Sequence, residues 1–354
     1  MPGKTTYDLL HARNIDQYAR QVRASYLKAI KQVSLIAKNA RLDAQDSFYF
    51  KNNKNIQLKV NNVLKELQNN VYGTTVTGIN SEWELAVEKN NAVAQKIYGK
   101  NLDQLPEDYK AKYLSNNDEA RLDFVSRKMN GLGLSDRVWN NTQQFKQELE
   151  LALETSIGKG KSARSIASEI TQYLNNPDKL FRRIKDKETG VMRLSKAAKA
   201  FHPGQGKYRS SYKNALRLAR NETNFSYEGS NHLKQQQQDF VVGIEIRTSP
   251  QHVASDDKGG ISCIDLQGKY PKDFDFTYKW HVNCKCMSLT ILKTKEELDK
   301  DLDSILAGNE PNKSSINKVK VLPKKYTTYL KDNKEKFDNW KTMPRTFENN
   351  PINK

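Results

Sequence analysis

The spacing of apolar residues changes near residue 240, and this change predicts a chain with two kinds of structure. Before it, apolar residues recur every three or four positions, which is the period of an α-helix. After it the pattern alternates as in a half-buried β-strand, with Val242, Ile244 and Ile246 on one side. The sequence therefore predicts an α+β protein whose N-terminal half is predominantly helical. The first helical run spans residues 8–45 and has these apolar residues at helical spacing: Ile15, Tyr18, Val22, Tyr26, Ile30, Val33 and Ala37.

Further helices are predicted from the same spacing. One covers residues 57–73 and ends at Gly73, and the next begins after a capping box formed by Ser81 and Glu84. Ser162 is the predicted N-cap of a later helix. We expect three parts along the chain: a helical N-terminal arm, a small β-containing and metal-stapled module, and a helical C-terminal tail. Their predicted bounds are residues 1–133, 134–292 and 293–354.

The chain is strongly basic, with 59 Lys and Arg against 41 Asp and Glu and a formal net charge of +18. The excess is regional, because residues 158–235 contain 17 Lys and Arg against 6 Asp and Glu. Such a charge favours a polyanionic partner, above all nucleic acid. A basic surface that serves solubility or an acidic protein partner is the alternative. No long apolar run is present, so we expect no membrane span.

One predicted helix, residues 207–229, carries cations along a single face. At about 100° per residue these cations fall within a stripe of roughly 80°. Side chains so placed can reach successive phosphates without reading bases. A solvated helix face is the alternative. The candidate DNA-binding residues are Arg209, Lys213, Arg217 and Arg220.

Glu222 lies near the apolar face of the same predicted helix. A half-buried carboxylate needs a hydrogen-bond donor or a cation as its partner. We therefore predict a structural ion pair, assigned to Arg220 and Glu222. Catalysis would need a second positioned group, and no spacing in this helix identifies one.

All three cysteines and two of the five histidines lie between residues 252 and 286. Zinc prefers four thiolate or imidazole ligands in a tetrahedron, brought together by a small β-rich fold. His281, Cys284 and Cys286 lie within six positions, and Cys263 arrives from a preceding loop. These four residues are the candidate ligands of a structural zinc ion.

Other uses of these residues stay open at this stage. The C-x-C spacing is tighter than the C-x2-C of common zinc knuckles. His252, Asp256 and Asp257 are alternative sources of the fourth ligand in place of His281. A disulfide from Cys263 to one of the later cysteines, a Cys–His nucleophilic pair and buried free cysteines are the remaining alternatives.

Three stretches together resemble a known family: "ALRLARNETNFSYEGS", "SPQHVASDDKGGISCIDLQGKYPKDF" and "WHVNCKC". In this order, over about residues 135–292, the chain is similar to the Mu F-like phage head morphogenesis domain. Members carry an Arg-Thr-Glu step in the helix and a closing His-Pro-x-Cys-Arg-Cys. Here Asn221 stands at the threonine, Val282 at the proline and Lys285 at the arginine.

The resemblance implies a structural minor head protein of a phage or prophage, and no enzymatic activity. Implied partners are the portal protein and double-stranded DNA, with scaffold or major capsid protein as further candidates. The implied location is the virion interior, after assembly in the host cytoplasm. Two alternatives are a metal-dependent enzyme (a nuclease or toxin) carried by the same module, and a cellular nucleic-acid-binding zinc protein.

Overall fold

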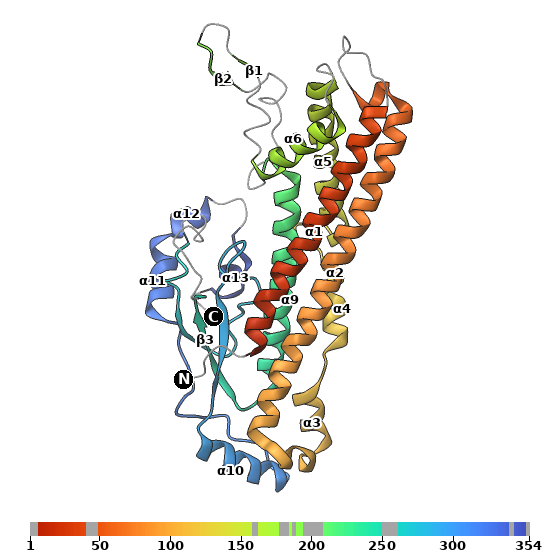
Figure 1. Ribbon diagram of the computed structural model, residues 1–354. Helices are drawn as coiled ribbons and strands as arrows, with labels where there is room; N and C mark the ends of the chain where they lie inside the picture. The colour runs from red at the N-terminus through yellow and green to blue at the C-terminus, as the bar shows by residue number, and fades with distance from the viewer. Residues whose placement is uncertain are drawn as a thin grey trace. The chain divides into compact units, whose positions relative to one another are not determined.

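The computed structural model describes residues 6–39, 49–157, 162–176, 184–185, 189–193, 208–249, 261–339 and 343–351 (Figure 1). It is mostly helical with a small antiparallel sheet, which confirms the predicted α+β class and the helical N-terminal half. The helices before the sheet are α1 (Thr6–Asn39), α2 (Lys54–Tyr98), α3 (Glu107–Leu114), α4 (Asp118–Ser126), α5 (Leu134–Ile157), α6 (Ala163–Asn175) and α9 (Ser211–Gln237). Those after it are α10 (Lys295–Leu306), α11 (Lys324–Asp332), α12 (Lys334–Asp338) and α13 (Arg345–Asn349), which confirms a helical tail.

The sheet has three antiparallel strands in the order β4-β3-β5. Their bounds are Val241–Arg247 for β3, Gly268–Tyr270 for β4 and Met287–Leu292 for β5. Ile244 of the central strand lies opposite Tyr270 on one side and Thr290 on the other. The predicted strand is confirmed, and Ile244 and Ile246 are fully buried. Val241 and Gly243 are buried as well as Val242, so burial alternates only from Ile244 onward. Two further short strands, β1 (Ile184–Lys185) and β2 (Met192–Arg193), pair with each other.

The chain forms two compact units, each assembled from separate stretches. Unit 1 comprises Met1–Ile15, Gly78–Phe124 and Asn221–Lys354, and unit 2 comprises Asp16–Thr77 and Val125–Arg220. These units group residues by contacts, whereas the predicted arm, module and tail divide the chain by sequence. That three-part division stays a prediction.

Unit 1 has an aromatic core beside its sheet. Trp280, which is fully buried, lies 5.0 Å from the ring of Phe276 and 5.8 Å from that of Phe347. Tyr326 of α11 packs edge-on against Tyr270 of β4, with ring centroids 5.7 Å apart. The tail helices therefore complete the core around the sheet, because their aromatic side chains bury apolar area that the strands alone would expose.

Unit 2 is held by a helical core with one buried carboxylate. Tyr26 of α1 packs against Phe145 of α5 and Tyr212 of α9, at centroid distances of 5.0 and 5.5 Å. Glu148 accepts hydrogen bonds from the Ser211 backbone N–H at 2.7 Å and from the Ser211 hydroxyl at 2.5 Å. Burial raises the pKa of Glu148 to about 8, although the Ser211 hydrogen bonds act in the opposite direction.

Helix predictions that rest on a long apolar face are confirmed. Along α1 the residues from Tyr18 to Ala37 that recur at helical spacing are buried. The Ser162 hydroxyl caps α6 by accepting from the Ser165 N–H at 3.2 Å, as predicted. The buried apolar residues of α6 include Ile166, Ile170 and Leu174.

The predicted break inside α2 is wrong. The helix runs from Lys54 to Tyr98 without interruption, so Gly73 does not end it and the Ser81–Glu84 pair does not cap a new one. A glycine within a helix costs only about 1 kcal/mol relative to alanine. Buried side chains on both sides of Gly73, including Val71 and Ile79, offset that cost. Among the described residues, no helix combines the length and apolar character needed to cross a membrane.

Candidate metal centre and basic helix face

Three predicted ligands lie together in unit 1. The Cys263 Sγ lies 2.9 Å from the His281 Nε2 and 3.7 Å from the Cys284 Sγ. The ligand atoms of all three residues lie within 4.8 Å of one another. Cys263 precedes β4, and the other two residues precede β5, so the sheet brings the two loops together. The group could hold a metal ion, because thiolates and an imidazole are ligands that bind soft or borderline ions.

A tight turn places His281 and Cys284 on the same side. The Cys284 N–H donates to the His281 carbonyl oxygen at 3.2 Å, which closes the turn. Asn283 adopts a φ of 60° and Lys279 a φ of 53°. Asparagine tolerates this left-handed conformation better than most residues, while lysine does so at a cost. Contacts with neighbouring residues must therefore stabilise the left-handed backbone conformation of Lys279 in this turn.

The imidazole of His281 is oriented by its own backbone neighbour. Its Nδ1 lies 2.9 Å from the carbonyl oxygen of Val282, which can only accept a hydrogen bond. Nδ1 therefore carries the proton of the neutral ring, and Nε2 is the nitrogen that faces Cys263. A ring nitrogen fixed in this way is the usual arrangement for a histidine that binds a metal.

Cys286 lies beside this group and interacts with both other thiols. Burial by itself would raise the pKa of the Cys284 thiol. Hydrogen bonds with Cys263 and Cys286, and the nearby His281 and Lys279, lower that pKa well below its ordinary value. Interactions with Cys284 and Cys286, together with burial, raise the pKa of Cys263. Cys284 is thus the thiol most readily ionised. Cys286 as the fourth ligand stays a prediction.

Helix α9 fixes the backbone of the metal-binding turn through amide side chains. Asn221 Oδ1 accepts from the Asn283 N–H at 2.9 Å, and Asn224 Nδ2 donates to the Cys284 carbonyl oxygen at 3.0 Å. The two asparagines are three residues apart, so they share one face of the helix. Neither asparagine is among the predicted site residues. Buried amides at helical spacing, continued by Asn231 and Gln235, are the signal that could have identified them.

A buried ion pair supports the other end of the same segment. Lys279 Nζ lies 2.9 Å from Glu228 Oε1 and also donates to the Cys286 carbonyl oxygen at 2.5 Å. Glu228 accepts a second hydrogen bond, from the Ser288 hydroxyl at 2.6 Å. The pair therefore ties α9 to the residues on both sides of Cys286. Both charges are desolvated, so the loss of either partner would leave the other buried and unpaired.

The first residues of α1 back this arrangement within unit 1. His11 Nε2 lies 3.0 Å from Asn224 Oδ1, and the His11 ring stacks on Tyr227 at 3.9 Å. Its other ring nitrogen contacts Glu82 of α2. Asn224 thus uses its oxygen toward α1 and its amide nitrogen toward the metal-binding turn. No predicted site residue lies in this part of the chain.

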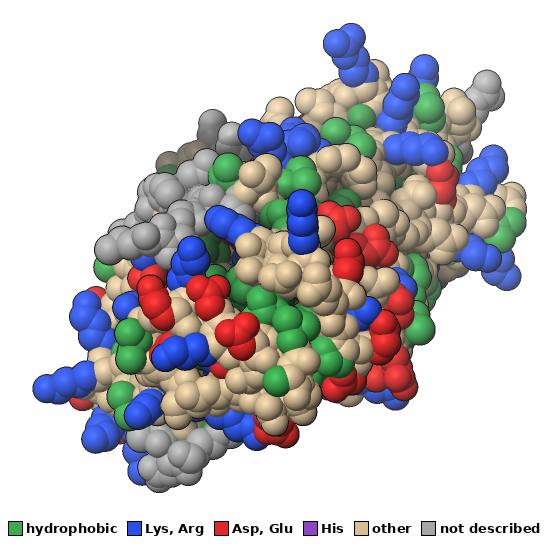
Figure 2. All heavy atoms as spheres, turned by 90° about the horizontal axis from the view of Figure 1, so that it is seen from below, with side chains coloured by type: hydrophobic (Ala, Val, Ile, Leu, Met, Phe, Trp, Pro, Cys, Tyr) green, Lys and Arg blue, Asp and Glu red, His purple; other side chains and the backbone are tan. Residues whose placement is uncertain are grey.

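The four predicted DNA-binding residues are all half-buried in unit 2. The guanidinium of Arg217 lies over the Tyr208 ring, 5.4 Å from its centroid, and burial lowers its pKa. Arg220 lies 3.6 Å from Asp16, and 40% of its side chain is exposed. On the face drawn in Figure 2, basic side chains are scattered among acidic ones. The stripe remains a candidate for DNA contact, with Arg209 and Lys213 as its other members.

Two other parts of the predicted site have different outcomes. Glu222 is buried, with 1% of its surface exposed, as its position near the apolar face predicts. Its pairing with Arg220 stays a prediction. The alternative ligands His252, Asp256 and Asp257 lie outside the described residues.

Comparison of the chain with protein-family models, with curated proteins and with solved structures finds no match.

Proposed function

We propose that this chain is a minor head protein of a tailed phage or prophage, a structural component of the capsid interior that binds the portal and double-stranded DNA. The observation that carries the proposal is the buried group of Cys263, His281 and Cys284. His281 and Cys284 occupy positions at which the sequence resembles the closing motif of the head morphogenesis domain, and Cys263 lies in the stretch that resembles the loop before it. Asn221 and Asn224 add to this support, since they tie the motif to the helix that carries the Arg-Thr-Glu-like step.

Zinc is the ion that we propose for the group, with Cys286 as the fourth ligand. A set of three thiolates and one imidazole matches a structural zinc site. Cys286 lies in the same buried core as Cys263 and Cys284, and its thiol shifts the pKa of both, which supports its place in the set. In this role zinc crosslinks two loops of the module, and its binding free energy contributes to folding.

Burial of the ligands supports a structural role over the alternative of a metal-dependent nuclease or toxin. A catalytic zinc keeps one coordination position open to water or substrate. Here Cys263 is 0%, Cys284 2% and His281 7% exposed. The neighbouring carboxylate of Glu228 is occupied by Lys279 and Ser288 rather than directed to solvent.

Metal content tests the site directly. Elemental analysis of the purified full-length chain should give about one zinc per chain, as a four-ligand site requires. Cys284→Ser should lose most of it, while Ile264→Ala, at an exposed position beside Cys263, should not. A metal-free wild type with all three thiols reactive after unfolding would overturn the zinc assignment.

DNA binding by the basic face of α9 is tested by its salt dependence. The affinity for a short duplex should fall as salt rises, with a log–log slope that lessens by about 0.9 for each phosphate contact removed. Lys213→Gln and Arg209→Gln should each reduce the slope. Lys59→Gln, an exposed lysine of unit 2 on α2, is the control. An affinity that stays flat with salt would argue against electrostatic DNA binding.

Assembly with a portal tests the remainder of the proposal. The chain, expressed together with the portal protein encoded near it, should co-purify with that portal. Mass spectrometry should also find the chain in purified particles at low copy relative to the major capsid protein. Its absence from particles that contain a portal would overturn the assignment to the virion interior.

A further inference from the structure

Unit 1 contains a cleft of about 670 Å³ that is separate from the metal centre. Its lining includes Val241 and Val242 of β3. Acidic residues around it are Asp239, Asp273 and Glu310. Lysines outnumber them, and the lining set is Lys112, Lys272, Lys313, Lys318 and Lys320. The cleft therefore carries a net positive charge.

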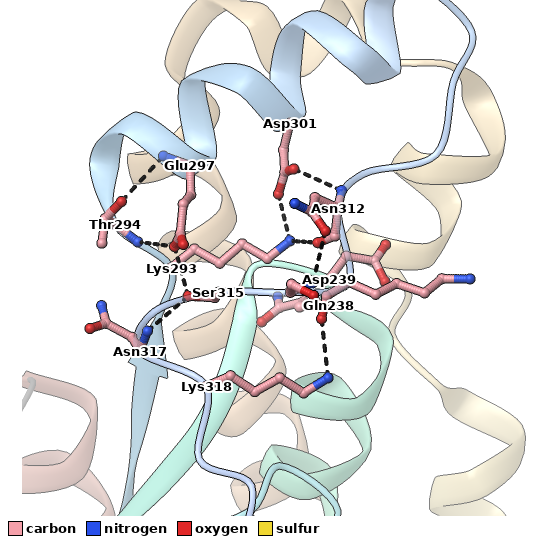
Figure 3. A network of polar contacts seen from close by, with 12 residues as sticks. Gln238, Asp239, Lys293, Thr294, Glu297, Asp301, Asn312, Ser315, Asn317 and Lys318 are labelled. Atoms are coloured by element: carbon pink, nitrogen blue, oxygen red, sulfur yellow. Dashed lines mark hydrogen bonds and ion pairs between the residues drawn. The ribbon is translucent and has the colours of Figure 1, made fainter.

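A buried ion pair anchors one wall of the cleft. Lys293, at the end of the sheet, pairs with Asp301 of α10 at 2.6 Å and donates to the Asn312 carbonyl oxygen at 2.5 Å (Figure 3). The Asn312 N–H in turn donates to Asp301 at 2.9 Å. Asn312 lines the cleft, so this wall is fixed by charge-assisted hydrogen bonds.

The same wall is attached at two further points. Thr294 is the N-cap of α10, and the Glu297 carboxylate accepts from the Thr294 N–H at 2.9 Å and from the Ser315 hydroxyl at 2.7 Å (Figure 3). The Val319 N–H donates to the Val242 carbonyl oxygen at 3.1 Å, which joins the wall to the central strand. The cleft is thus bounded by segments with defined hydrogen bonds.

Three of the five lysines have no carboxylate within ion-pair distance among the described residues. Lys272 donates to the Gln238 carbonyl oxygen at 2.9 Å, and Lys318 donates to the Lys313 carbonyl oxygen at 3.1 Å. Lys320 is exposed at the rim. An ammonium group has three donors, so both carbonyl-bound lysines keep donors for a ligand.

The positive charges act on one another inside the cleft. Burial, followed by the positive charges of Lys112, Lys293 and Lys318, lowers the pKa of Lys272 to about 8, against the opposing effect of Asp239. Like charges at close range disfavour each other, and partial burial strengthens the effect. An anion with several charges would relieve this repulsion.

We propose that the cleft binds a small anion bearing two or more phosphate groups, held by Lys272, Lys318 and Lys320. Phosphate oxygens accept hydrogen bonds from several ammonium groups at once, and charge-assisted hydrogen bonds are the stronger ones. The walled volume suits a free compound such as a triphosphate. This site shares no residue with the metal centre or with the basic face of α9, so it does not depend on the proposed head function.

Titration calorimetry of the full-length chain with inorganic triphosphate tests the site. Lys272→Gln and Lys318→Gln should each weaken binding by about tenfold, the loss expected for one charged hydrogen bond. Lys300→Gln, an exposed lysine of α10 outside the cleft, should leave the affinity unchanged. Lys320→Gln provides a variant at an exposed position, where a folding defect is not expected.

Two comparisons identify the ligand class. Inorganic monophosphate should bind much more weakly than triphosphate, because it engages fewer lysines. Equal binding of the two anions, or an equal loss in Lys300→Gln, would overturn the proposal. A short duplex DNA whose affinity depends on Lys272 and Lys318, with no triphosphate binding, would instead assign these lysines to nucleic-acid phosphates and overturn the assignment to a free anion.

Discussion

The amide of Asn224 donates to the carbonyl oxygen of Cys284 at 3.0 Å, so a helix side chain holds the backbone of a candidate metal ligand. The same side chain accepts from His11 through its oxygen. Residues that orient metal ligands in this way commonly affect metal affinity by 10- to 100-fold. Asn224 links the N-terminal end of α1 to the metal-binding turn within unit 1.

Replacement of Asn224 should therefore weaken metal binding while all the ligands remain. We expect Asn224→Ala to lower zinc affinity by about 10-fold or more, which is the usual effect of removing a residue that orients a metal ligand through a hydrogen bond. Competition with a chromophoric chelator would measure the change. Asn90→Ala is the matched control, since Asn90 bonds to Asn231 of the same helix but not to the turn. An unchanged affinity in Asn224→Ala would argue against its orienting role.

Cys286→Ser decides between a three-cysteine and a two-cysteine site. If Cys286 is the fourth ligand, the variant should lose zinc at a chelator concentration that leaves the wild type loaded. Its thermal unfolding temperature should also fall toward that of Cys263→Ser. If only Cys263→Ser and Cys284→Ser lose metal, the fourth ligand is another group and the set of three in the structure is the complete cysteine and histidine contribution.

Glu148 should make stability decrease as the pH rises. Its pKa in the folded chain is about 8, against an ordinary value of 4.5, so the folded state holds the proton over this window and the unfolded state does not. The free energy of unfolding should therefore fall between pH 4.5 and 8, by up to about 1.4 kcal/mol per pH unit. Urea unfolding at several pH values measures the slope.

The control for this slope is Glu148→Gln. Its amide oxygen can still accept the Ser211 N–H, and it has no proton to lose. The pH-dependent loss assigned to Glu148 should disappear in this variant, with other titrating groups left in place. A variant whose slope over pH 4.5–8 equals that of the wild type would assign the dependence to other groups.

Two glycines should respond in opposite directions to replacement by alanine. At Gly243 of β3 a Cβ would lie 2.6 Å from the Val319 Cγ2 and 3.2 Å from the Tyr270 carbonyl oxygen. Gly243→Ala should destabilise the chain by about 1–3 kcal/mol through overpacking. At Gly73, in mid-helix, a Cβ meets no atom within 4 Å among the described residues. Gly73→Ala should stabilise it by about 0.5–1 kcal/mol. Urea unfolding checks both signs.

Local periodicity was sufficient to predict the fold class and the buried face of α1. Val22, Tyr26 and Val33 are buried, at the helical spacing from which their burial was predicted. The uninterrupted course of α2 past Gly73 was not predictable in the same way, since packing from distant segments offsets the local cost of glycine. The periodicity of a segment indicates which face of its own helix is apolar, and it contains no information on the distant segments that pack against that face.

The metal group and its support differ in how visible they are in the sequence. Cysteines are rare in this chain, so the clustering of Cys263, Cys284 and Cys286 predicts a site from the sequence alone. Asn221 and Asn224 are ordinary helix-surface residues by type. Their role depends on a turn about 60 residues later in the chain, and no local pattern encodes that distance.

The hydroxyl of Tyr227 donates to Asp8 at 2.9 Å, across 219 positions of sequence, and Asp8 also pairs with Lys89. During synthesis on the ribosome, the charged Asp8 and Lys89 therefore emerge long before the tyrosine that shares their buried site. Unit 1 cannot close around them until the second half of the chain has been made, while all of unit 2 precedes Asn221. Tyr227 therefore becomes available to Asp8 only after 219 further residues have been added to the chain.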